Sequence, residues 1–486
     1  MALGERQVVV VGGGLAGLAA AEALVAAGAT VTVVEPAGRC GGVLESVHRD
    51  GWLIERSADC FLAARPEAVD LAGRLGLAEH LVPVEPRVRR ALVWDAGRAV
   101  PVPEGFRLLA PSRPGSILRT PLLSPAGRLR VLMEPLVPVR RPRPGAGADD
   151  ESLERFAVRR LGREAFERLV QPLAAGVWTA DPARLSMAAA CPDFLAMERE
   201  AGGLWAGERR RLRAAAEAGT AGARYGQFLT FTDGIEALPR RLASRLAAEG
   251  VRFVTAAVTA VARDASAGWR VSVTDRPALA ADGVVVAAPA PVAARLLEGV
   301  DSRLAADVAA IEYAGSAVVS LGFRRDAITH PLDAAGMVVP RRAGRRILAV
   351  SFSSAKFPGR APDGHVLMRV FVGGALDPAA LDLDDAGLET LAAAEVGAML
   401  GIRGRPVIAR VDRWHKAMPQ YHVGHVDRVA RIDAALDAHP GLALAGAAYK
   451  GVGIPQVIAS GQAAARRSTA HVGIPPSVPR PASAGW

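Results

Sequence analysis

The feature that most constrains this chain is the stretch at residues 8–35, VVVVGGGLAGLAAAEALVAAGATVTVVE. Its pattern predicts a strand, a glycine-rich turn, a helix and a second strand that ends in an acid. Gly12 would allow the tight turn, Gly14 would let bare backbone approach a pyrophosphate, and Gly17 would let the helix pack closely on the strand. The phosphates would then lie at the helix N-terminus, where free N–H groups favour negative charge. Glu35 would accept ribose hydroxyls and repel a 2′-phosphate, which disfavours NADP.

The same stretch could also be taken for a membrane-spanning or signal segment. Between Val8 and Val34 the only charged residue is Glu22, so its hydropathy resembles that of such segments. The three glycines, the β-branched run at 31–34 and the lack of a preceding basic region favour the dinucleotide-binding unit instead.

Length and composition predict a compact enzyme. The 486 residues exceed what one simple core holds, so we expect about two to three lobes. Half of the residues are hydrophobic, which excludes a largely disordered chain. The three cysteines, Cys40, Cys60 and Cys191, form neither a disulfide framework nor a zinc pattern, which indicates a reducing compartment and no metal site.

The net charge of +10 comes almost entirely from arginine, since only Lys356, Lys416 and Lys450 are lysines. The excess is uneven: residues 82–143 hold twelve arginines against four acids. Such a basic region can face nucleic acid, anionic lipid or an acidic substrate. Its neighbours are Leu, Val and Pro rather than stacking aromatics, so we expect lipid headgroups or a carboxylated substrate and no nucleic acid.

A second glycine turn follows the first unit. Arg39, Gly41 and Gly42 in PAGRCGGVLESV could bring a cation and backbone amides to the far side of the pyrophosphate. Two such turns around one βαβ unit favour a single extended ligand such as FAD. Farther along, residues 228–258, 282–290 and 442–467 return to strand, turn and helix patterns, and several strands are expected between 311 and 375.

Several separate blocks resemble the protoporphyrinogen oxidase family of flavoproteins, which is related to flavin amine oxidases and carotenoid desaturases. The blocks that carry the resemblance are VVGGGLAGLAAA, GRCGGVLES, residues 151–187, FLTFTDGIEAL, residues 351–374, RWHKAMPQYHVGH and AGAAYKGVGIPQVIASG. They extend over nearly the whole chain.

The resemblance implies an α/β fold with an α+β substrate domain: a Rossmann-like FAD-binding domain of the flavin amine oxidase type, plus a mostly helical lobe. We expect the FAD-binding domain to be discontinuous. It would comprise residues 1–65, 225–295 and 410–475, the substrate-binding domain 66–100 and 296–409, the helical lobe 101–224, and a disordered tail 476–486.

Carried over residue by residue, the family pattern also implies a cofactor site. The pyrophosphate would be held by Gly12, Gly13, Gly14, Leu15, Ala16 and Gly17, and from the far side by Arg39, Gly41, Gly42 and Val43. Glu35 and Pro36 would hold the adenosine ribose, and Val258 would pair with adenine through its backbone. The flavin ring would be bordered by Ser57, Ala58, Asp59, Cys60, Trp414, Val452, Gly453 and Ile454.

The activity implied by the resemblance is oxidation of protoporphyrinogen IX to protoporphyrin IX, with oxygen as acceptor, in haem biosynthesis. Hydride transfer to a flavin needs orientation rather than a nucleophile or metal, so no catalytic residue is assigned, and His422 and His425 are expected to be structural. Arg90 would bind a substrate propionate. Two departures bear on this site: Ser57–Ala58 replaces a Gly-Pro-like pair, and DAAGM at 333–337 replaces an aromatic, which implies a wider pocket.

Three alternatives remain open from sequence. The substrate could be coproporphyrinogen III, the enzyme could be a flavin amine oxidase or carotenoid desaturase, or the chain could be a non-catalytic binding protein on the same scaffold. We also expect a cytoplasmic location with peripheral contact of the helical lobe at the inner face of the membrane, because Leu and Arg alternate there. Homodimer formation is a further expectation.

Overall fold

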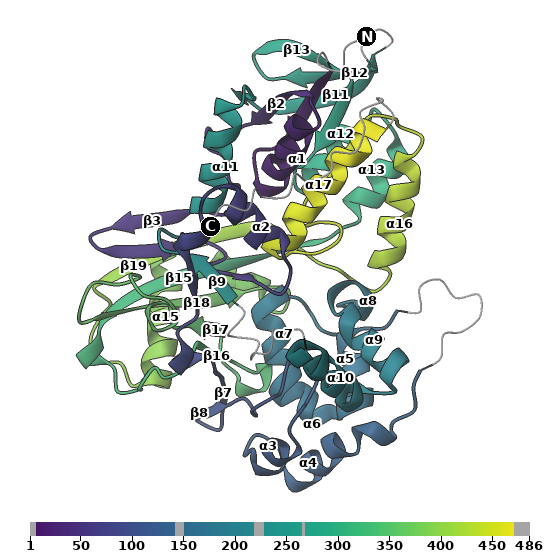
Figure 1. Cartoon of the computed structure of the whole chain (residues 1–486). Helices are drawn as coiled ribbons and strands as arrows, with labels where there is room; N and C mark the ends of the chain where they lie inside the picture. Colours follow the sequence, from purple (N-terminus) through teal and green to yellow (C-terminus); the bar gives the residue numbers. More distant parts are fainter. Residues whose placement is uncertain (1–5, 141–149, 218–227, 265–267, 471–486) are drawn as a thin grey trace.

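A computed structural model describes residues 6–140, 150–217, 228–264 and 268–470. Its upper region in Figure 1 is built on a five-stranded sheet in which every neighbouring pair is parallel. The strand order is β10 (Arg252–Thr255), β2 (Thr30–Glu35), β1 (Gln7–Val11), β14 (Gly283–Val286) and β20 (Leu442–Leu444). The strands predicted at 8–11, 31–35 and 442–444 are thereby confirmed, whereas the strand predicted at 282–290 ends at Val286 and a helix begins at Ala290.

Helices and a small sheet cover the two faces of this parallel sheet. On one face α1 (Leu15–Ala26), α11 (Ala237–Ala248) and α17 (Ile454–Ala470) share a core with Val8 and Val10. On the other face Val9 and Val11 pack with the antiparallel strands β11 (Val258–Asp264), β12 (Gly268–Val273) and β13 (Arg276–Ala281). Burial on both faces explains the continuous valine runs in these strands.

A second sheet has seven strands and mixed pairing (Figure 1). Its order is β19 (Ile408–Pro419), β15 (Tyr313–Arg324), β18 (His365–Gly373), β17 (Ile347–Ser351), β16 (Gly336–Val338), β7 (Ala91–Asp95) and β8 (Arg98–Pro101). One face packs against α15 (Asp385–Leu400) through a buried apolar core. The domain prediction assigned residues from 410 onward to the FAD-binding domain, whereas β19 lies in this sheet beside β15.

The other face of the seven-stranded sheet carries a row of polar residues. Register places Arg410, Ser320, Arg369 and Ser351 directly opposite one another on β19, β15, β18 and β17. Residues directly opposite across paired strands share one face, so the row crosses four strands on the side away from α15. This face receives the loop that follows the hairpin of β3 (Ser46–Arg49) and β4 (Trp52–Glu55).

The third region is helical and forms the lower end in Figure 1. Its principal helices are α3 (Pro114–Arg119), α4 (Pro125–Leu132), α5 (Leu153–Leu161), α7 (Gln171–Trp178), α9 (Pro192–Ala201) and α10 (Leu204–Glu217). The helix α5 has an apolar stripe that includes Phe156 and is buried, and Gly162 ends the helix at a φ of +92°. A fully buried ion pair between Arg160 and Glu134 joins α5 to the segment after α4.

Among the helices of the described ranges, none is both long enough and apolar enough to span a bilayer. The predicted tail at 476–486 lies outside the described residues.

Candidate active site

The first glycine turn has the geometry that a pyrophosphate needs. Gly12 has a φ of +105°, and a Cβ on Gly17 would lie 1.9 Å from the carbonyl oxygen of Gly12. At Gly14, the N-cap of α1, a Cβ would find no atom closer than the Cα of Gly42, at 3.9 Å. Because no side chain caps this helix and its first turn has no acid, the N–H groups of Leu15 and Ala16 are available for a phosphate.

Glu35 lies at the carboxyl end of β2, with its carboxylate turned toward the glycine turn. Its two oxygens accept hydrogen bonds from the backbone N–H groups of Gly13 (2.7 Å) and Ala37 (2.9 Å). Pro36 follows directly, and β10 and β11 bring Val258 to the same edge, where the N–H of Ala256 donates to the carbonyl of Glu35. The residues predicted for the adenosine half therefore lie together.

The second glycine turn packs on the first. The N–H of Gly41 donates to the carbonyl oxygen of Gly13 at 2.8 Å, and Gly41 forms a bridge with Gly14. Arg39 binds the carbonyl of Gly42 and pairs with Glu45 at 2.7 Å. This arrangement supplies backbone and a cation on the far side of the turn.

Hydrogen bonds and packing connect the loop predicted to border the flavin ring with the second glycine turn, β19 and the start of α17. The hydroxyl of Ser57 donates to the carbonyl of Val43, directly after the second glycine turn. The indole N–H of Trp414 donates to the carbonyl of Arg56 at 2.8 Å. Ala58 packs in the same core as Ile454. The second glycine turn, the strand that carries Trp414 and the core around Ile454 therefore all border the segment at 56–60.

Behind this loop lies a buried charge cluster that sequence analysis did not identify. The carboxylate of Asp59 pairs with Lys356 at 2.7 Å and with Arg369 at 3.1 Å, and Arg369 also donates to the carbonyl of Ser57. Burial alone would raise the pKa of the Asp59 carboxyl, but the charges of Lys356 and Arg369 outweigh it and hold that pKa below its ordinary value. The only available sequence signal was that Lys356 is one of three lysines in an arginine-rich chain.

The closing glycine loop lies between β20 and α17. Gly446 has a φ of +125° with open space where a Cβ would be, and Gly451 has a φ of +134°. Val452 and Gly453 lead directly into α17, which begins at Ile454. Since β1 and β20 belong to one parallel sheet, α1 and α17 both begin near its carboxyl edge.

These features fit an extended FAD. The two packed glycine turns leave room for the pyrophosphate at the start of α1, the Glu35 carboxylate is placed for a ribose, and the space at Gly446 is open. Of the residues predicted to hold FAD, those of the two glycine turns, Glu35 and the closing loop lie along this edge, and Trp414 reaches the Ser57–Cys60 loop from β19 through Arg56.

Arg90 and His425 lie in different parts of the structure, since His425 borders the closing glycine loop through the carbonyl of Tyr449. Arg90 precedes β7, is about half exposed and pairs with Asp333, so the predicted propionate ligand meets the DAAGM segment. His425 is buried and stacks on Tyr421 with ring centroids 4.2 Å apart. Burial lowers the pKa of its imidazole, which fits the structural role expected for it.

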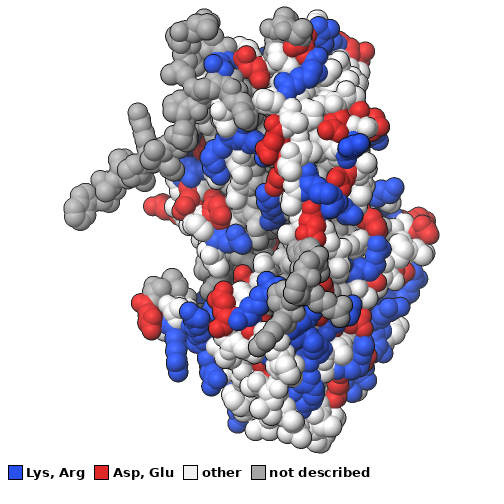
Figure 2. All heavy atoms as spheres, turned by 90° about the vertical axis from the view of Figure 1, so that its right-hand side faces the viewer, with Lys and Arg blue, Asp and Glu red and all other residues white. Residues whose placement is uncertain are grey.

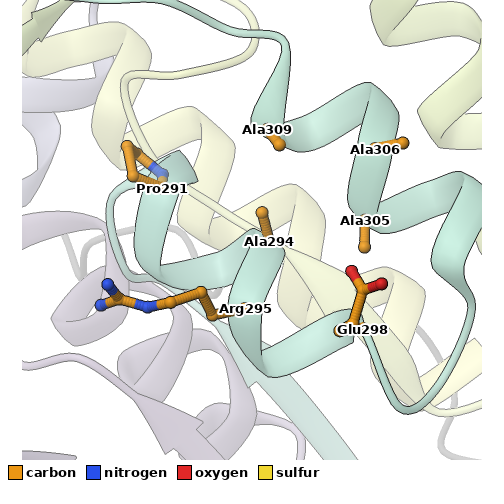
Figure 3. Close-up of a pocket in the computed structure, with 7 residues that line it drawn as sticks. All are labelled: Pro291, Ala294, Arg295, Glu298, Ala305, Ala306 and Ala309. Carbon is orange, nitrogen blue, oxygen red and sulfur yellow. The ribbon is translucent and has the colours of Figure 1, made fainter.

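Two cavities lie away from these residues. One, of about 420 Å³, lies between α12 (Ala290–Leu297) and α13 (Ser302–Ala309). Figure 3 shows Glu298 and Ala305 facing each other across this gap while Arg295 extends away from α13. The other, of about 950 Å³, borders α5. None of the predicted site residues lines either cavity, and the described residues contain no cluster of three or more His, Cys, Asp or Glu side chains suited to a metal ion.

Comparison with known proteins agrees with this geometry. The family model described as "Flavin containing amine oxidoreductase" matches residues 15–468. The chain is 31% identical to the coproporphyrinogen III oxidase of Bacillus subtilis (strain 168), covering 96% of this chain and 98% of that protein. It is 34% identical to the coproporphyrinogen III oxidase of Propionibacterium freudenreichii, covering 93% and 88%.

A crystal structure from Exiguobacterium sp. 255-15, provisionally named as a protoporphyrinogen oxidase, superposes with a TM-score of 0.82 at 29% identity, covering 95% of this chain and 98% of that one. These matches confirm the predicted fold class, the flavin cofactor of the FAD type and the resemblance itself. The chain is an oxidoreductase that belongs to the flavin containing amine oxidoreductase family, among its porphyrinogen oxidases.

Proposed function

We propose that this protein uses FAD and molecular oxygen to oxidise a porphyrinogen to the corresponding porphyrin in haem biosynthesis. The observation that carries the proposal is the joint assembly of both glycine turns, the Ser57–Cys60 loop and the closing loop at one sheet edge. Porphyrinogen oxidase relatives that match along nearly the whole chain support the same substrate class.

FAD held by the glycine turns and Glu35 would supply the acceptor for hydride from a meso carbon of the porphyrinogen and the route for those electrons to oxygen. The protein contributes binding and orientation. The glycine turns and Glu35 fix the dinucleotide, while Ser57 and Trp414 join the flavin-side loop to the second turn and the seven-stranded sheet. Such immobilisation brings reacting atoms into a productive geometry and accounts for much of an enzyme's rate gain.

Protoporphyrinogen IX and coproporphyrinogen III are the two candidate substrates. The family resemblance implies protoporphyrinogen IX as the first candidate substrate. The two curated relatives described above are coproporphyrinogen III oxidases at 31% and 34% identity, which supports testing coproporphyrinogen III beside it. Coproporphyrinogen III has four carboxylates and protoporphyrinogen IX has two. The arginines of residues 82–143 would therefore attract both substrates.

An aerobic assay with each purified porphyrinogen tests the proposal through the appearance of porphyrin fluorescence. We expect a yellow protein and enzyme-dependent fluorescence with at least one substrate. The matched control is Gly17→Val, in which a side chain would collide with the carbonyl of Gly12, and we expect it to lose flavin and activity together. Equal rates with heat-inactivated protein would mean autoxidation alone, and peroxide release from simple amines would favour an amine oxidase.

We also propose that this protein is cytoplasmic and contacts the inner face of the membrane through α3, α4 and residues 133–140. Five of its large apolar side chains are exposed there: Leu118, Leu129, Met133, Leu136 (75% exposed) and Val139. Figure 2 shows basic side chains among uncoloured residues over this lower end. Exposed apolar residues with basic neighbours suit an anionic lipid surface, although ion pairs such as Arg107–Glu208 neutralise part of the basic excess.

Sedimentation with phosphatidylglycerol vesicles tests this membrane contact. We expect binding that falls when Leu129→Glu and Leu136→Glu are combined, and no change with Val407→Glu, an exposed valine on the seven-stranded sheet side. The proposed membrane contact would be contradicted if the wild type, the double variant and Val407→Glu sedimented equally with the vesicles. It would also be contradicted if no wild-type protein sedimented with them. Homodimer formation stays a prediction that sedimentation velocity tests.

A further inference from the structure

We propose that Lys356, Asp59 and Arg369 form a buried cluster with a net positive charge that favours the negatively charged reduced flavin, and so raises the reduction potential of the cofactor. The inference rests on the flavin site of the proposed function. These residues act through the Ser57–Cys60 loop, so Lys356 and Arg369 are positioning residues.

The charge balance of the cluster follows from its contacts. Two cations share one carboxylate oxygen, since Lys356 Nζ lies 2.7 Å and Arg369 3.1 Å from Oδ2 of Asp59. Lys356 Nζ also lies 3.3 Å from the Ser351 hydroxyl. Burial alone would lower the pKa of the Lys356 ammonium, but the Asp59 carboxylate keeps that pKa above its ordinary value. All three groups are therefore charged at neutral pH, which leaves one excess positive charge.

The neighbouring ionisable groups do not cancel the net positive charge of this cluster. The guanidinium of Arg360 is buried over the ring of Phe357, and it donates hydrogen bonds to neutral oxygens of residues 230–232. Glu55 is a further buried acid that interacts electrostatically with Arg369, and burial raises its pKa to about 7, so it does not carry a full negative charge at neutrality. Burial and the neighbouring carboxylate raise the pKa of the Cys60 thiol, so this group stays neutral.

A continuous series of contacts joins the cluster to the cofactor site. Arg369 donates to the carbonyl of Ser57, the Ser57 hydroxyl donates to the carbonyl of Val43, and Val43 follows the turn that packs on Gly13. The excess charge thus lies directly behind the loop that borders the flavin. A buried charge is weakly screened, and an opposite charge favours the ionised form of a nearby group, here the reduced flavin anion.

The test is the reduction potential of the FAD-loaded protein, measured by equilibration with reference dyes. Lys356→Met removes the excess charge, and we expect the equilibrium between oxidised and reduced flavin to change by about tenfold, which lowers the potential by about 30 mV for a two-electron couple. Adding Asp59→Asn to Lys356→Met restores one net positive charge through Arg369. We expect most of the lost potential to return in this double variant.

The exposed ion pair of Arg324 and Asp326, each 66% exposed, provides matched controls. Arg324→Met and its double variant with Asp326→Asn make the same charge changes at the surface, and we expect the wild-type potential in both. If Lys356→Met does not accumulate as folded protein, the same comparison is made at Arg369 on β18. The variants are then Arg369→Gln alone and Arg369→Gln combined with Asp59→Asn.

A purely structural cluster gives a different pattern. In that case the variant with both Lys356→Met and Asp59→Asn would bind FAD no better than Lys356→Met alone, and its reduction potential would not recover. This result would overturn the proposal. An equal shift in the Arg324 variants would also overturn it. Potentials are measured without porphyrinogen, so a protein that binds flavin but oxidises another substrate would refute the proposed function and leave this test intact.

Discussion

The hydroxyl of Tyr421 accepts a 2.8 Å hydrogen bond from the backbone N–H of Gly451. The same hydroxyl donates to the carbonyl of Ala447, so one buried side chain joins two points of the closing glycine loop. His425 stacks on the Tyr421 ring, and its Nε2 lies 2.9 Å from the carbonyl of Tyr449. The conformation of the loop predicted to hold the flavin therefore depends on two side chains outside it.

We expect Tyr421→Phe to weaken FAD binding. The change leaves a partly buried N–H and a partly buried carbonyl without their partner, at a combined cost of about 1–3 kcal/mol. About 1.4 kcal/mol corresponds to tenfold in affinity, so we expect the Kd for FAD to rise at least about tenfold, measured by the fluorescence of released flavin.

Tyr449→Phe is the matched control for Tyr421→Phe. Tyr449 belongs to the same loop, and within the described part of the chain its buried hydroxyl has no hydrogen-bond partner. We therefore expect this variant to bind FAD as well as the wild type. Equal losses in the two variants would show that ring packing, rather than the hydrogen bonds of Tyr421, holds the loop.

We expect Gly461→Ala to destabilise the contact between α1 and α17. A Cβ at this position would lie 2.2 Å from the carbonyl oxygen of Ala16, so the helices must separate. Overpacking of this kind costs about 1–3 kcal/mol, and because both helices begin at the cofactor edge, thermal stability and flavin content should fall together. Gly299→Ala, where a Cβ meets open space, should change neither.

The cofactor half of this site could be predicted from the sequence because its requirements are local. Gly12, Gly14 and Gly17 have roles fixed by spacing within one strand–turn–helix unit, and Glu35 ends the next strand. The same holds for Gly162, which interrupts an apolar stripe and ends α5.

The rest of the site depends on tertiary pairing, which a local pattern does not contain. Asp59 and Lys356 are separated by nearly three hundred positions, and only the register of the seven-stranded sheet brings Arg369 to the same carboxylate. The assignment of residues 410–419 to the FAD-binding domain was wrong for the same reason, whereas β20 and α17 do lie with the five-stranded sheet. The pairing of the strand at 408–419 with β15 places it in the seven-stranded sheet.

We expect Arg90→Leu to raise the KM for the porphyrinogen with little change in kcat, if Arg90 binds a propionate as the resemblance implies. A charge-assisted hydrogen bond is worth about 1.5–3 kcal/mol, so the KM should rise about tenfold or more in initial-rate assays. Arg87→Leu is the control, because Arg87 belongs to the same loop but is exposed and pairs with Glu85. An unchanged KM in Arg90→Leu would remove this residue from the substrate site.

Glu55 provides a prediction for the pH dependence of stability. Its carboxylate accepts hydrogen bonds from the Ser46 hydroxyl (2.6 Å) and the Ile235 N–H (2.8 Å). Burial nevertheless dominates and raises its pKa from 4.5 to about 7. Because the folded protein holds this proton more tightly than the unfolded chain, the contribution of Glu55 to stability is complete below about pH 4.5 and is lost as the pH rises through 7.

Glu55→Gln removes this titration and keeps a side chain of the same size. Each pKa unit corresponds to about 1.4 kcal/mol, so the variant should gain about 3 kcal/mol relative to the wild type between pH 4.5 and pH 8. The measurement is the thermal midpoint of both proteins at the two pH values, with the exposed Glu298→Gln as control. A constant difference between Glu55→Gln and the wild type would mean that the Glu55 carboxyl has the same pKa in the folded and unfolded states, because only a difference in proton binding between the two states makes stability depend on pH.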